Sequence, residues 1–178
     1  MQKNVFCTLM LSILYFVQPV HAEVVAKGNT GFQIKIEHTI EANEKQLFAT
    51  LMDIAKWWSS DHTYSGDASN LSLSLKEKCF LETLPNGGFV RHLELVNYQP
   101  GKMLVLSGGL GPLQPMGVHG ALTISSQVNE SKTGCRLTAM YNVSGFAEAG
   151  LENLAPVVEG VLAQQFAKLK KVVESQNP

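Results

Sequence analysis

The chain has 178 residues, of which 45% are hydrophobic and 16% are charged, and its formal net charge is −1. This composition is typical of one globular domain with a substantial core, and two separate domains would each be small. The charge is nearly balanced and the chain carries no broad basic field, so we do not expect nucleic acid to be a partner.

Residues 1–22 have the pattern of a secretory signal peptide. Lys3 gives a short positive region, residues 5–17 are almost entirely apolar, and Ala22 is a small residue at a suitable cleavage position. The alternative is an uncleaved anchor, but the apolar run is shorter than the roughly 20 residues that span a bilayer. We therefore expect cleavage near Ala22, export to the periplasm or the exterior, and no stable membrane anchor afterwards.

The mature chain should begin with a flexible polar lead-in, residues 23–30. Apolar and polar residues then alternate through residues 32–40, which is typical of a half-buried strand. Asn43 is a suitable N-cap for a short amphipathic helix that runs to Trp58. A polar segment rich in turn residues follows at 59–70.

Six further segments have the composition of strands, and turn residues separate most of them. They are residues 71–75, 79–84, 89–98, 103–107, 118–128 and 135–144. The longest break is residues 108–117, which we interpret as a rim loop or lid because it contains two prolines. Residues 151–173 then place apolar side chains at three- and four-residue spacings, which predicts a long helix whose first turn Pro156 should disturb.

Seven strands and these helices predict an α+β fold, in which an antiparallel sheet curls around the long C-terminal helix. Small residues at Gly120, Ala139 and Ala163 would leave room for a ligand-sized cavity between the sheet and the helix. The residues expected to line it are Phe80, Glu82, Leu122, Tyr141, Leu162 and Phe166. The alternative is a solid interior filled by aromatic side chains: Phe80, Phe89, Tyr141 and Phe166.

Two groups of polar residues are candidates for catalysis. His92 and Glu94 should share one face of a strand, where they could act as an acid–base pair. We favour the alternative that both face solvent in a surface salt network. Asp61, His62 and Tyr64 lie in the loop after the tryptophans and could face a pocket mouth, although turn formation explains them equally well.

Other kinds of site are not indicated. The histidines have no recognisable metal-ligand spacing, and no nucleotide-binding or hydrolase motif occurs, so we predict no metal and no cofactor. Cys79 and Cys135 both lie in predicted strands, and nothing in the sequence fixes the distance between them. A disulfide is possible in an exported protein, but we favour two free thiols.

Several stretches resemble the helix-grip superfamily that includes START and Bet v 1-like proteins, also called SRPBCC. The closer resemblance is to bacterial members described as polyketide cyclase/dehydrase-like or activator-of-Hsp90-ATPase-like, and it covers residues 31–173. The stretches are Ala55-Lys56-Trp57-Trp58 running into Asp61-His62-Thr63-Tyr64-Ser65-Gly66-Asp67, then Asn70-Leu71-Ser72-Leu73, Arg91-His92-Leu93-Glu94 and Gly109-Leu110-Gly111-Pro112-Leu113-Gln114. The resemblance implies a helix-grip domain over residues 31–178, with two short helices after the first strand and a hydrophobic pocket.

We therefore expect an exported protein that holds an apolar small molecule, such as a lipid, a polyketide or a steroid-like compound. The alternative is a cyclase/aromatase-like or hydrolase-like enzyme that acts in the same cavity. The resemblance also suggests a chaperone-interacting module, which export would disfavour because the cytosolic partner would be absent. The sequence identifies neither the ligand nor the oligomeric state.

Overall fold

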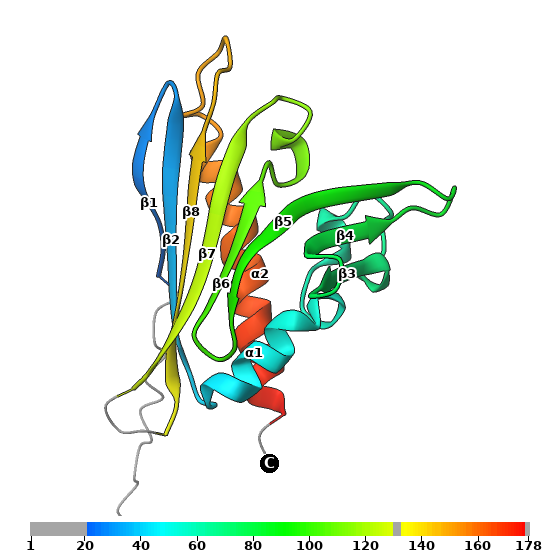
Figure 1. Cartoon of the computed structure of the whole chain (residues 1–178). Coiled ribbons are helices and arrows are strands. Elements are labelled where there is room, and N and C mark those ends of the chain that lie inside the picture. Colours follow the sequence, from blue (N-terminus) through cyan, green and yellow to red (C-terminus); the bar gives the residue numbers. More distant parts are fainter. Residues whose placement is uncertain (1–20, 130–132, 177–178) are drawn as a thin grey trace, which may run out of the picture.

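The computed structural model describes residues 21–129 and 133–176 (Figure 1). The predicted signal peptide lies outside the described residues except for His21 and Ala22. No helix in the described part of the chain is long and apolar enough to cross a membrane.

In the part of the chain that the structure describes, one antiparallel sheet of eight strands forms the framework, in the order β1-β2-β8-β7-β6-β5-β4-β3. The strands are β1 (His21–Gly28), β2 (Gly31–Ile40), β3 (Leu71–Ser74), β4 (Cys79–Thr83), β5 (Phe89–Gln99), β6 (Met103–Gly108), β7 (His119–Val128) and β8 (Cys135–Ser144). The predicted α+β class and the antiparallel sheet are confirmed, but the number of strands is eight rather than seven.

The additional strand is β1, which occupies most of the segment predicted to be a flexible lead-in. It pairs with β2, from His21 opposite Glu37 to Gly28 opposite Gly31. The pairing register shifts between Val24 and Ala26, so apolar and polar residues do not alternate along β1. The prediction of a lead-in was wrong because this edge strand lacks the two-residue period on which it relied.

Within the described residues, two α-helices and several 3-10 turns complete the fold. Helix α1 (Glu44–Met52) begins at Asn43, whose side-chain oxygen accepts a hydrogen bond from the Gln46 N–H at 2.9 Å, as the capping prediction requires. The 3-10 helices η1 (Ile54–Lys56), η2 (Ser60–His62) and η3 (Ala68–Asn70) follow it. Helix α2 (Ala155–Ser175) starts later than predicted, with Pro156 in its first turn, where the missing N–H is tolerated.

Helix α2 lies along the inner face of the sheet. Leu162, Phe166, Leu169 and Val173 are fully buried on one side of it, at the predicted spacing. Figure 1 shows that β3, β4 and the start of β5 bend away from the remaining strands, so the sheet curves around the helix. The space between this bent corner and the first half of α2 is where the candidate site lies.

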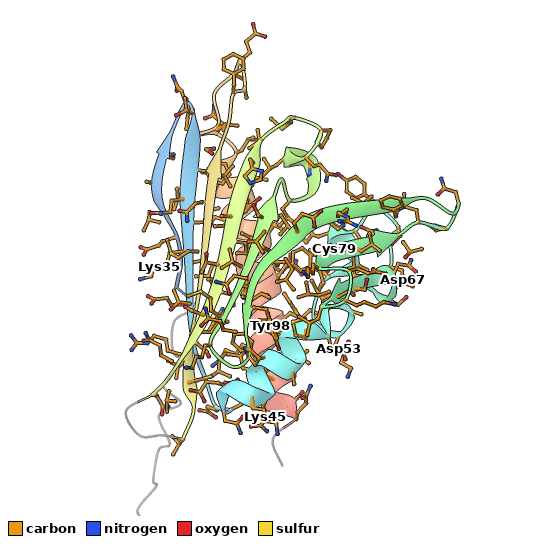
Figure 2. All side chains as sticks on the ribbon, in the orientation of Figure 1. Lys35, Lys45, Asp53, Asp67, Cys79 and Tyr98 are labelled. Carbon is orange, nitrogen blue, oxygen red and sulfur yellow. The ribbon has the colours of Figure 1, made fainter. Side chains whose placement is uncertain are left out.

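The two cysteines of the described residues, Cys79 and Cys135, are both buried and both free, as favoured from the sequence. Cys79 lies on β4 (Figure 2), whereas Cys135 begins β8, which the strands β7, β6 and β5 separate from β4 in the sheet.

Candidate functional site

A cleft of about 350 Å³ opens between the first half of α2, the loop that contains η2, and the segment that contains η4 (Gly111–Leu113). This volume is in the range typical of small-molecule sites. Its floor is aromatic, formed by Trp58, Phe80 and His92. The other lining residues are Asp61, His62, Thr63, Tyr64, Leu110, Gly111, Pro112, Leu113, Met116, Leu154, Val157, Val158, Val161 and Leu162.

The η2 wall of the cleft is fixed to α2 by hydrogen bonds. The Ser59 N–H donates to Gln165 Oε1 at 2.7 Å, and Lys168 Nζ donates to the Trp58 carbonyl at 2.8 Å. A third hydrogen bond, of 2.9 Å, joins His62 Nε2 and Gln164 Oε1. These contacts hold the candidate residues of the loop in position relative to the helix.

The opposite wall is the segment of residues 108–117, as the rim-loop interpretation expected. Its Leu110 N–H donates to the Tyr141 hydroxyl at 3.1 Å, and Gln114 Nε2 donates to the Arg91 carbonyl at 2.7 Å. Gly111 and Gly117 have φ angles of 57° and 70°, a backbone region that favours glycine. Hydrogen bonds thus attach the segment to the sheet on both sides of its turn, and the segment forms an ordered rim of the cleft.

The space between the middle of the sheet and α2 is filled, contrary to the prediction that small residues leave it open. A methyl group at Gly120 would lie 2.5 Å from a ring carbon of Tyr141, so that ring occupies the room that the glycine provides. A separate void of about 10 Å³, lined by strand residues and by Leu51, Ile54, Trp57 and Trp58, is too small for a ligand. Burial raises the pKa of Tyr141 to about 12, so its hydroxyl stays protonated.

His92 lies inside the cleft because of a β-bulge. Leu93 pairs with Phe80 and Arg91 pairs with Leu81, so His92 is the extra residue between them. The bulge interrupts the alternation of faces, and consecutive His92 and Leu93 are both buried. The prediction that His92 faces solvent was therefore wrong.

Glu94 does lie on the outer surface, as favoured from the sequence. Its side chain is 50% exposed and pairs with Arg91 at 2.8 Å. His92 and Glu94 therefore do not share a face and do not form the predicted acid–base pair. The carboxylate that contacts His92 is Glu82, whose Oε2 lies 2.9 Å from His92 Nε2.

Glu82 is a fully buried carboxylate held by several donors. Its Oε1 accepts a hydrogen bond from the Ser65 N–H, while its Oε2 faces His92. Burial alone would raise the pKa of Glu82, but hydrogen bonds from Ser65, His92 and the Tyr64 backbone outweigh burial and lower it. Glu82 is therefore ionised at neutral pH.

His92 is a buried imidazole between two aromatic rings. Its ring centroid lies 4.7 Å from that of Phe80 and 5.9 Å from that of Tyr64. Burial lowers the pKa of His92 and outweighs the opposite effect of Glu82, so the ring is neutral near pH 7. Its Nδ1 is buried and has no hydrogen-bond partner among the described residues.

Among the residues predicted to bind a ligand, Phe80 and Leu162 line the cleft, and Glu82 lies behind His92. Leu122, Tyr141 and Phe166 do not line it, because they belong to the filled interior. The catalytic candidates Asp61, His62, Tyr64 and His92 all line the cleft. The alternative interpretation, a solid interior filled by aromatic side chains, was wrong for Phe89, which is 67% exposed.

Sequence reasoning did not place the first turns of α2 or Met116 in the site, although it expected residues 108–117 to form a rim loop or lid. Val157, Val158 and Met116 line the cleft, although Val157 is 63% exposed. Their apolar character at an end of a helix and beside prolines was a weak signal that could have indicated a pocket rim. The Glu82–His92 contact gave no sequence signal, because it depends on the bulge.

A second depression, of about 870 Å³, lies between α1, the end of β3 and the turn between β5 and β6. Figure 2 labels Lys45 and Tyr98, which lie on two sides of this groove. It is broadly open to solvent and contains no buried polar side chain among its lining residues. We therefore place the candidate site in the smaller cleft.

Within residues 21–129 and 133–176, no group of three or more metal-ligating side chains comes together.

Comparison with known proteins identifies the fold. No protein-family model matches the sequence, and the curated proteins give no significant match. Among solved structures, protein MLL2253 from Mesorhizobium loti matches with a TM-score of 0.58 at 16% identity, covering 82% of this chain and 99% of the other. The Aha1 dimer from Colwellia psychrerythraea has a TM-score of 0.55 at 16% identity and coverages of 82% and 98%. SA2116 from Staphylococcus aureus, a protein of unknown function, has a TM-score of 0.55 at 14% identity, with coverages of 83% and 96%. The chain thus has the helix-grip fold that these structures share.

Proposed function

We propose that this protein binds a small, mostly apolar molecule in the cleft between the first half of α2 and the rim segment of residues 108–117. The observation that carries the proposal is the cleft itself, with its aromatic floor and largely aliphatic walls. A lining of this kind, with a few polar groups at defined positions, is typical of small-molecule sites. The ligand class that we propose is lipid-, polyketide- or steroid-like.

The test is a fluorescence titration with a naphthol, combined with a substitution that fills the cleft. Val161 is a half-buried lining residue, so Val161→Phe should reduce the affinity for naphthol at least about tenfold by occupying its space. Val96→Phe is the matched control, because Val96 is exposed and lines neither the cleft nor the groove. Equal affinities of the two variants, or no binding by the unsubstituted protein, would refute the proposal. Separately, native mass spectrometry of protein purified from its own host would identify any ligand that the protein retains.

A second candidate is an enzyme that acts in the same cleft, and the Glu82–His92 contact supports it. A carboxylate that orients a neutral imidazole is an arrangement used for general-base catalysis. Incubation of the protein with the molecule retained from its host distinguishes the two candidates. Unchanged recovery of that molecule supports binding, whereas conversion that Glu82→Gln abolishes supports catalysis.

We further propose that residues 1–22 are removed during export. The basis is the pattern of a positive start, an apolar run and Ala22. Cleavage after Ala22 would leave residues 23–28 of β1 paired with β2. The mass of the protein isolated from its host tests this, since a mature chain should begin at Glu23.

A further inference from the structure

The Nδ1 atom of His92 is a buried acceptor without a partner in the wall of the proposed site. Within the described residues, His38 Nε2, His92 Nδ1 and Gln165 Nε2 are the buried side-chain atoms that lack a hydrogen bond. Of these residues, only His92 lines the cleft. A buried polar group without a partner is energetically costly, so a ligand that supplies the missing hydrogen bond gains affinity.

The hydrogen bonds around Glu82 determine which nitrogen of His92 carries the proton. One oxygen of Glu82 is held by the Ser65 N–H, and the other faces His92 Nε2 at 2.9 Å. An ionised carboxylate can only accept, so Nε2 of the neutral ring must carry the hydrogen. Nδ1 therefore has a free lone pair and can accept a hydrogen bond but cannot donate one.

We propose that the cleft selects apolar alcohols and phenols, and that His92 Nδ1 accepts the hydrogen bond of their hydroxyl group. This inference rests on the proposed binding function and specifies its ligand class. An ether or a hydrocarbon of the same shape fills the apolar walls but leaves Nδ1 without a partner. A carboxylate has no proton to donate at neutral pH and also brings a negative charge toward the buried, ionised Glu82.

Tyr64 stacks on the face of the imidazole that carries the acceptor. Its ring stacks on His92 with an angle of 23° between the two planes, and Tyr64 is more than half exposed while His92 is 5% exposed. The lone pair of Nδ1 lies in the plane of the imidazole, so a ring stacked on the imidazole face does not occupy the direction from which a hydroxyl donates. Tyr64→Ala should therefore leave the affinity ratio between alcohols and their ethers unchanged.

The experiment compares a naphthol with its methyl ether, two fluorescent probes that differ in the hydroxyl proton. The wild-type protein should bind the naphthol about tenfold more tightly than the ether, because the naphthol alone satisfies Nδ1. A ratio near one would overturn this inference while leaving the cleft as a binding site. Failure of both probes to bind at any accessible concentration would overturn the proposed function as well.

Glu82→Gln gives a sharper test because it should reverse the tautomer of His92. The Ser65 N–H should hold the amide oxygen of the new side chain, which places the amide NH₂ opposite His92 Nε2. Nε2 then accepts and Nδ1 carries the hydrogen, so hydroxyl and ether oxygens both become acceptable partners. The preference for naphthol should fall to less than about twofold, and ¹⁵N NMR of the imidazole should show the proton moved from Nε2 to Nδ1.

Glu94→Gln is the matched control, since Glu94 lies on the outer face of the same strand pair. It should keep both the wild-type tautomer and the wild-type preference. His92→Phe preserves the aromatic stack and removes the acceptor, so it should also lose the preference. If Glu82→Gln retained the wild-type preference, Nδ1 would not be the acceptor and the inference would be wrong, whether or not His92→Phe folds.

Discussion

The two halves of α2 differ in what they pack against. In the second half, Phe166, Leu169 and Val173 are fully buried in a filled interior, and Phe166 contacts the Trp57 ring with centroids 5.9 Å apart. In the first half, Val157 and Val161 line the cleft and are partly exposed. One continuous apolar stripe thus serves as core at one end and as a pocket wall at the other. The periodicity of a helix shows which face turns inward but not whether the space beyond that face is filled.

The largest expected difference between the two halves of α2 is the loss of protein stability when a buried side chain is replaced by alanine. Phe166→Ala should lower the free energy of unfolding by about 3 to 5 kcal/mol, because it leaves a hole in a filled interior. Leu162→Ala, beside the cleft, should cost about 2 kcal/mol, since part of its surroundings is already open. Chemical denaturation of both variants measures the two values. Equal losses would show that the halves do not differ in packing.

A second difference concerns two buried histidines, His92 at the cleft and His38 under the second half of α2. The pKa of His38 is lowered by burial and by the charge of Lys170, against the opposing charge of Glu174. The pKa of His92 is lowered by burial against the opposing effect of Glu82. Each folded-state pKa lies below the ordinary value of 6.5, so below that pH the unfolded chain binds protons that the folded protein does not.

Stability should therefore fall as the pH decreases below 6.5, by up to about 1.4 kcal/mol per pH unit for each histidine. Below pH 4.5 the lowered pKa of Glu82 adds a further loss as that carboxylate becomes protonated. His38→Leu should make the first loss shallower without affecting naphthol binding, because His38 does not line the cleft. Denaturation curves between pH 7 and pH 5 measure the slope, and an unchanged slope would contradict this assignment.

The smallest effect is expected outside both halves, at the Arg91–Glu94 pair. Both side chains are about half exposed, and exposed ion pairs contribute little to stability. Glu94→Gln should leave the Tm unchanged within error, whereas a clear decrease would show that this surface pair has a structural role. The variant also serves as a control for Glu82→Gln, because both remove one carboxylate charge near His92.

Much of the fold could be predicted from local patterns. Alternation identified β2 and β8, the three- and four-residue spacing identified α2, and Asn43 marked the start of α1. Strand β1 was missed because a register shift removes its alternation and because an edge strand can be largely exposed.

The candidate site could be predicted less well, because it depends on contacts between distant segments. Asp61, His62 and Tyr64 lie in a loop after the tryptophans, which suggested a pocket mouth as one of two interpretations, and all three line the cleft. The inward turn of His92 depends on a bulge, and the filling of the space at Gly120 depends on the ring of Tyr141 from the neighbouring strand. The alternation of apolar and polar residues along one strand reveals neither a bulge nor a side chain that enters from another strand.

The most direct test of the proposed division of α2 is a methyl NMR titration of the protein with naphthol. The methyl signals of Met116, Val157 and Val161 should shift progressively, because these residues line the cleft. Those of Leu169 and Val173 in the filled interior, and of Met52 and Leu75 at the open groove, should remain in place. Shifts confined to the groove, or centred on Leu169 and Val173, would contradict a ligand site at the first half of α2.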